Sequence, residues 1–108
     1  MAQNFRRFTS NAVGTSPATI HTANSYDTIV GISVSNILTT AINVDVYIND
    51  SANDIYLVKT APIPSGGSLQ ILDGGAKVVV QNNDAIKVVS DTASSADVWV
   101  SMVDAIST

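Results

Sequence analysis

Apolar and polar residues alternate along several stretches of the chain. In residues 41–49, AINVDVYIN, one face of an extended chain would carry only Ile and Val, and the other would carry Asn, Asp and Tyr47. Residues 27–36, DTIVGISVSN, place Val30, Ile32 and Val34 opposite Gly31, Ser33 and Ser35. Alternation with a period of two is typical of an antiparallel strand with one buried and one wet face. Both stretches are therefore predicted strands over one core.

Turn-forming residues separate the predicted strands. Pro62, Pro64 and the pair Gly66–Gly67 predict a turn or crossover, because proline cannot donate to a strand ladder and glycine accepts unusual dihedral angles. The sequence Asp73–Gly74–Gly75 predicts a hairpin. With turns roughly every 8–12 residues, the pattern predicts about seven or eight short strands. Two packed sheets are needed to bury them, so we expect an all-β antiparallel β-sandwich of jelly-roll or immunoglobulin-like type.

The first part of the chain is patterned differently. Residues 1–24 are rich in Ser, Thr, Asn and Ala and alternate only in the short run ATIHTA. We expect an extended N-terminal arm or edge strand over residues 1–24, followed by the sandwich domain over residues 25–108.

Composition supports the β reading and narrows the function. The 108 residues include 14 Val, 11 Ile and only four Leu, and there is no Glu. β-branched residues fit pleated sheets, whereas helix surfaces are usually rich in Glu and Lys. The net charge is −4 with five basic residues, which argues against a nucleic-acid surface. Cysteine is absent, which excludes disulfides and thiolate metal sites.

The segment that begins the chain, MAQNFRRFTSNAVG, has no apolar signal core, and no apolar run is long enough to span a bilayer. We expect a chain made in the cytoplasm, without a cleaved signal and without a membrane partner.

Candidate chemistry is sparse. The loop NDSAND, with Asp50, Asn53 and Asp54, has ligand types suited to calcium but lacks the glycine and glutamate of an EF-hand loop. A simple hairpin is the favoured interpretation, with a weak cation site as the alternative. His21 is the only histidine and is expected to be a solvated strand residue. We therefore predict no catalytic residues, no metal, no cofactor and no enzyme activity.

The aromatic residues point to contacts. If Val98, Val100 and Met102 face the core, Trp99 faces outward, and the same argument places Tyr47 outward. An exposed tryptophan favours a subunit interface. The alternatives are a flat sugar-binding platform and a last strand buried on both faces. The run Val78, Val79, Val80 favours a central strand or an oligomer contact.

Several stretches together resemble a known family. They are TSPATIHTA, NVDVYIND, YLVKTAPIPSGGSLQIL, GGAKVVVQNNDAIKVVSD and ADVWVSMVDAI, which cover roughly residues 8–106. They are similar to small virion structural proteins of tailed bacteriophages, particularly phages of cyanobacteria. Trp99 departs from the pattern, because the family has an aliphatic residue there. The resemblance implies a multicopy, non-enzymatic structural protein located in the virion.

Within that family we expect capsid decoration (cement), acting as a homo-oligomer on the major capsid proteins. The alternatives are a tail or neck component, with tail proteins as partners, and a carbohydrate-binding module for host attachment through Tyr47 and Trp99. The sequence FRRF, Phe5, Arg6, Arg7 and Phe8, is the only basic-aromatic cluster and is expected to anchor the N-terminal arm on an acidic capsid surface.

Overall fold

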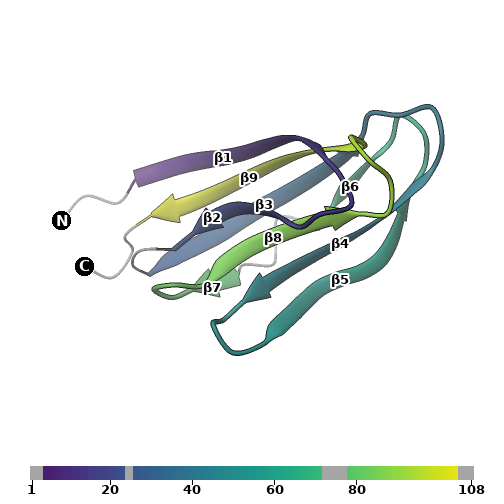
Figure 1. Ribbon diagram of the computed structural model, residues 1–108. Helices are drawn as coiled ribbons and strands as arrows, with labels where there is room; N and C mark the ends of the chain where they lie inside the picture. Colours follow the sequence, from purple (N-terminus) through teal and green to yellow (C-terminus); the bar gives the residue numbers. More distant parts are fainter. Residues whose placement is uncertain (1–3, 24–25, 72–77, 105–108) are drawn as a thin grey trace.

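A computed structural model describes residues 4–23, 26–71 and 78–104, and these form two antiparallel sheets (Figure 1). The described strands are β1 (Asn4–Val13), β2 (Ala18–Thr22), β3 (Asp27–Asn36), β4 (Ile42–Asn49), β5 (Asp54–Ile63), β6 (Ser68–Gln70), β7 (Val78–Val80), β8 (Ala85–Ser90) and β9 (Ala96–Asp104). The prediction of an all-β antiparallel β-sandwich is confirmed. The first segment, predicted as an arm or one edge strand, forms two strands, β1 and β2.

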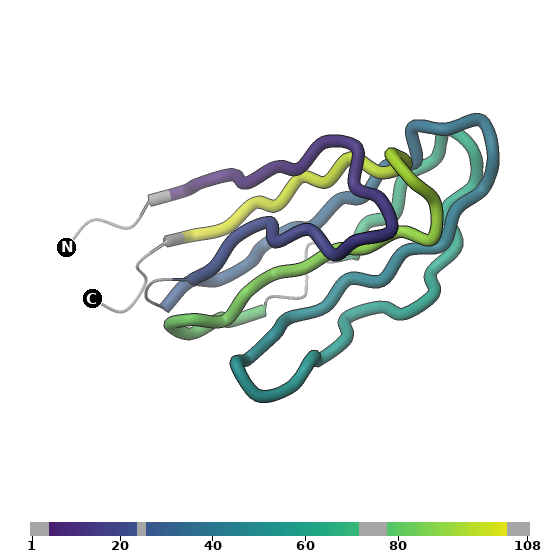
Figure 2. The backbone as a smooth tube through the Cα atoms, viewed as in Figure 1, coloured from purple at the N-terminus to yellow at the C-terminus, as the bar shows by residue number. Residues whose placement is uncertain are grey.

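The chain pairs with itself as one long folded ribbon (Figure 2). Strand β1 pairs with β9, β2 with β8, β3 with β6 and β7, and β4 with β5. Successive pairs fall alternately in the two sheets. The five-stranded sheet has the order β1-β9-β3-β6, with β7 also paired with β3, and the four-stranded sheet has the order β2-β8-β4-β5. This ribbon wrapped over two sheets is the arrangement of a jelly roll. The turn between β4 and β5 is the tip of the ribbon.

The core lies between the sheets and is built from Ile and Val. Val98, Val100 and Met102 of β9 face it, as predicted. Strand β3 differs in one detail, because its register shifts between Ile29 and Gly31. This bulge turns Ile29 into the core, and Val30, which was expected to face inward, is only partly buried.

Residues 4–22 supply an edge strand to each sheet. Strand β1 lies at the edge of the five-stranded sheet, and β2 lies at the edge of the four-stranded sheet. The pairing of β1 with β9 runs without a break from Asn4 to Ser10. This segment therefore has its strand partner within the same chain.

The valine run lies at a sheet edge. Within the described residues β7 pairs with β3 alone, on the side of β3 that β6 also occupies. Val80 is buried, Val78 is partly buried, and Val79 is 60% exposed. The expectation of a central strand is therefore wrong, and the oligomer contact stays a prediction. The predicted hairpin at Asp73–Gly75 lies outside the described residues.

Candidate functional site

The outer face of the five-stranded sheet carries most of the predicted contact residues. The strand registers align its outward side chains in rows that cross the sheet. One row is mainly apolar and consists of Phe5, Val103, Thr28 and Val79. Phe5 is 88% exposed and Val79 is 60% exposed. We call these four residues the apolar row.

Two other rows lie towards the opposite end of the same face and are polar apart from Trp99. They contain Thr9, Trp99, Ser33 and Gln70 in one row, and Asp97, Ser35 and Ser68 in the next. Trp99 is 52% exposed, so it points outward as predicted, and the alternative of a strand buried on both faces is wrong.

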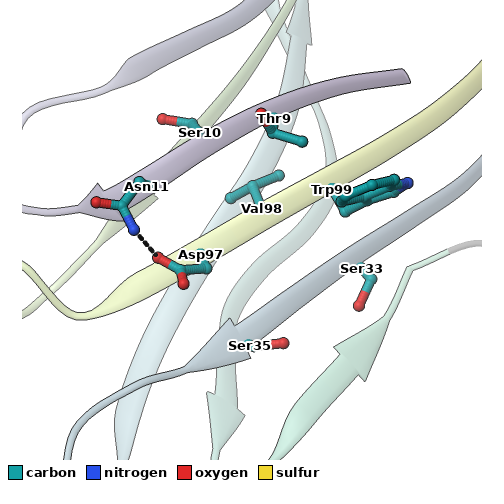
Figure 3. A pocket seen from close by; sticks show the side chains of 8 residues that line it. All are labelled: Thr9, Ser10, Asn11, Ser33, Ser35, Asp97, Val98 and Trp99. Atoms are coloured by element: carbon teal, nitrogen blue, oxygen red, sulfur yellow. Dashed lines mark hydrogen bonds between the residues drawn. The ribbon is translucent and has the colours of Figure 1, made fainter. Parts of the chain in front are cut away.

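A cleft of about 350 Å³ opens beside Trp99 (Figure 3). Its lining comes from three strands and consists of Thr9, Ser10 and Asn11 on β1, Asp97, Val98 and Trp99 on β9, and Ser33 and Ser35 on β3. Figure 3 draws the indole edge-on, with Thr9 on one side of it and Ser33 on the other. The ring therefore stands between β1 and β3 as a wall of the cleft, which we call the Trp99 cleft.

Asp97 holds the end of β1 against β9 at the other end of the cleft. Its Oδ1 accepts hydrogen bonds from Asn11 Nδ2 at 3.0 Å and from the Ala12 backbone N–H at 2.9 Å. Ala12 has a φ of 55°, which marks the irregularity where β1 leaves its register. Asp97 Oδ2 makes no hydrogen bond to any residue that the structure describes, so it is available to a ligand.

The FRRF cluster is split between the two faces of β1. The guanidinium of Arg7 lies over the Trp99 ring, 5.4 Å from its centre, on the outer face. Arg6 lies 5.1 Å from the centre of the Phe8 ring, which is itself stacked on His21. Strand alternation places these pairs on opposite faces of β1, and the anchoring of the arm on an acidic surface stays a prediction. Only Phe5 and Arg7 belong to the outer face described above.

Tyr47 does not join Trp99, because it belongs to β4 in the other sheet. It points away from the core, but neighbouring side chains cover it and leave it only 6% exposed. Tyr56 packs against it with ring centres 4.9 Å apart, and Lys59 lies over Tyr56 at 4.3 Å. Burial, and secondarily the Asp54 carboxylate, raise the pKa of the Tyr47 phenol. The prediction of an exposed Tyr47 sharing a sugar platform with Trp99 is therefore wrong.

His21 links the two sheets and is not solvated as expected. Its Nε2 lies 3.3 Å from Oδ2 of Asp27, a fully buried carboxylate at the start of β3. Its ring is stacked on Phe8 with centres 3.9 Å apart. These contacts give His21 a structural role between β2 and β3. The absence of catalytic residues stays a prediction.

The loop between β4 and β5 uses its acidic side chains to close the turn. Asp50 Oδ1 accepts hydrogen bonds from the backbone N–H groups of Asn53 and Ala52, and these bonds lower the pKa of the carboxyl. Asp54 accepts a hydrogen bond from Asn49. The geometry agrees with a hairpin. Across the described residues, no three His, Cys, Asp or Glu side chains gather in a way that suits a metal ion.

Sequence reasoning missed the partners of Trp99 in the cleft. Asn11 and Asp97 come from distant parts of the chain, and no pattern within either stretch points to the other. The one available signal was the run of small outward residues Gly31, Ser33 and Ser35, which is unusual for a strand in the middle of a sheet.

The described part of the chain contains no helix that is long and apolar enough to cross a membrane. No family model, no curated protein and no solved structure matches the chain.

Proposed function

We propose that this chain is a non-enzymatic structural component of a phage particle, with capsid decoration as its role. The observation that carries the proposal is the apolar row, Phe5, Val103, Thr28 and Val79, which crosses the outer face of the five-stranded sheet. In this role the row is the surface through which neighbouring copies of the chain bind one another on the particle.

The exposure of the row supports a contact surface. Phe5 and Val79 are 88% and 60% exposed, and the row joins them across four strands. Large apolar side chains that gather on one surface tend to mark protein contacts. Burying them against a partner gains roughly 25 cal/mol for each Å² of apolar surface removed from water.

The charge next to the row supports a protein partner as well. Arg7 follows Phe5 on the same face of β1, and arginine is enriched at protein interfaces. A small domain also gains stability when symmetric copies cover its apolar surface. The jelly-roll topology is a weaker argument, because viral capsid and lectin domains use it and a fold alone does not determine a function.

Particle composition tests this proposal. We expect mass spectrometry of purified particles, from the phage that encodes the chain, to detect many copies of it per particle. A Phe5→Ser, Val79→Ser double variant should remain folded, because both side chains are exposed, and should be strongly depleted from the particles. The control Ile55→Ser changes a similarly exposed residue on β5 in the other sheet and should be retained. A wild-type chain that is abundant in the lysate and absent from the particles would contradict the proposal.

Tagged particles in electron microscopy would then locate the chain. Label over the capsid surface is expected for decoration, whereas label confined to the tail or neck would place the structural role there.

A further inference from the structure

We propose that the Trp99 cleft is a binding site for a neutral saccharide. This inference goes beyond the structural role, and it uses the opposite end of the sheet face from the apolar row. The apolar row and the Trp99 cleft lie on the same face of the sheet but share no residue.

The indole of Trp99 supplies the first requirement of a sugar site, an exposed aromatic face. The guanidinium of Arg7, on β1, lies over the ring. On the other side of the ring lies Ser33 of β3, which lines the cleft together with Trp99 (Figure 3). A pyranose ring has an apolar face of C–H groups, which packs against an aromatic ring much as other apolar groups do.

The floor of the cleft supplies the second requirement, which is open space. The outward positions of β3 in the cleft are Ser33 and Ser35, and the next outward position along the strand is Gly31, where an added Cβ atom would meet no atom within 4 Å. Ser and Gly are poor choices for the middle of a sheet. Their presence beside Trp99 lets a ligand approach the sheet closely. The volume of about 350 Å³ falls at the lower end of the range for ligand pockets, roughly 300–1,000 Å³.

Polar groups around the floor supply the third requirement, which is recognition of hydroxyl groups. Asp97 is fixed by its bonds to Asn11 and Ala12, so its carboxylate is held in place before a ligand arrives. Ser33 is held by a hydrogen bond from Gln70 Nε2 at 3.0 Å. Carboxylate, amide and hydroxyl groups together accept from and donate to sugar hydroxyls. The negative charge of Asp97 in the cleft disfavours an acidic sugar, which is why we infer a neutral one.

The position of Trp99 provides a direct assay. It is the only tryptophan of the chain, so intrinsic tryptophan fluorescence reports on the cleft alone. The probes are glucose, galactose, mannose, N-acetylglucosamine and short oligomers of each, titrated into the full chain. We expect at least one of them to change the fluorescence in a saturable way.

A cleft-filling variant then tests the site. Ser35→Ile places a larger β-branched side chain on the cleft floor, where it suits the strand, and should weaken the binding of that saccharide by about ten-fold or more. Thr19→Ile makes a similar change on the exposed face of β2, away from the cleft, and should bind like the wild type. Circular dichroism should show that both variants remain folded. The proposal is overturned if no probe gives a saturable change, or if Ser35→Ile binds as tightly as Thr19→Ile. Both results are independent of whether the chain is found in particles.

Discussion

Asn36, the last residue of β3, joins three segments of the chain through one buried side chain. Its Nδ2 donates to the backbone carbonyls of Thr40, Ile63 and Pro64, and its Oδ1 accepts from the Leu38 N–H. Only 3% of the residue is exposed. An amide is required here, because no other side chain of this size both donates to carbonyls and accepts from an N–H.

We expect Asn36→Ala to lower the free energy of unfolding by about 2–3 kcal/mol, since buried carbonyls lose their donors. Urea denaturation monitored by circular dichroism measures this change. Asn82→Ala, at an exposed turn position, serves as the control and should change stability by less than about 0.5 kcal/mol. Equal effects at the two positions would show that the Asn36 hydrogen bonds contribute little.

For individual residues, the sequence predicted which way a side chain points better than how exposed that side chain is. Alternation correctly turned Val98, Val100 and Met102 inward and Trp99 outward. The same rule turned Tyr47 away from the core but missed its burial, to which the ring of Tyr56 on the neighbouring strand contributes. Alternation of apolar and polar residues predicts the face of the sheet on which a side chain lies. How exposed that side chain is depends on neighbouring strands that are distant in sequence.

Among the elements, β5 is an edge strand with an irregular course. Its pairing with β4 shifts register twice, on either side of Val46. At the first shift Thr60 has a φ of 53°, and its N–H donates to Asp45 Oδ1 at 2.6 Å. Pro62 lies further along the same strand. Bulges and proline twist or block an edge, so β5 is poorly suited to pair with another chain.

The left-handed conformation of Thr60 leads to a prediction about stability. Such a φ costs a non-glycine residue about 1–2 kcal/mol, whereas the added flexibility of glycine costs roughly 0.5–1 kcal/mol. Thr60→Gly is therefore expected to raise the free energy of unfolding by about 0.5–1 kcal/mol in chemical denaturation. The bond from the residue 60 N–H to Asp45 is retained.

The control for this variant is Thr22→Gly in β2, a threonine without a positive φ, which should lose about 1 kcal/mol. If both substitutions destabilised the protein alike, the bulge at Thr60 would not be strained.

The sequence predicted the strands with strict alternation, but over residues 1–24 it predicted an arm or one edge strand where the structure has two strands, β1 and β2. In β1 the inward and outward positions both carry polar or charged residues over much of its length, because an edge strand has less core to face. The bulge in β3 was also unpredictable, since a one-residue shift leaves no mark in an apolar stretch such as TIVGI.

At the scale of the whole molecule, composition and periodicity determined the class of fold, and the pairing of distant strands determined the site. The Trp99 cleft joins residues 9–11, 33–35 and 97–99, which come together only because the ribbon folds back on itself. Local sequence patterns cannot specify that juxtaposition. The apolar row has the same origin, since it draws one residue from each of four strands.

The central claim is that the apolar row is a contact surface, and the molecular mass of the chain in solution tests it most directly. Multi-angle light scattering over a range of concentrations should give a wild-type mass that rises to a multiple of 11.2 kDa. The Phe5→Ser, Val79→Ser double variant should stay at the monomer mass, and Ile55→Ser should assemble like the wild type. A wild-type chain that is monomeric at every concentration, or a double variant that assembles equally well, would contradict the claim.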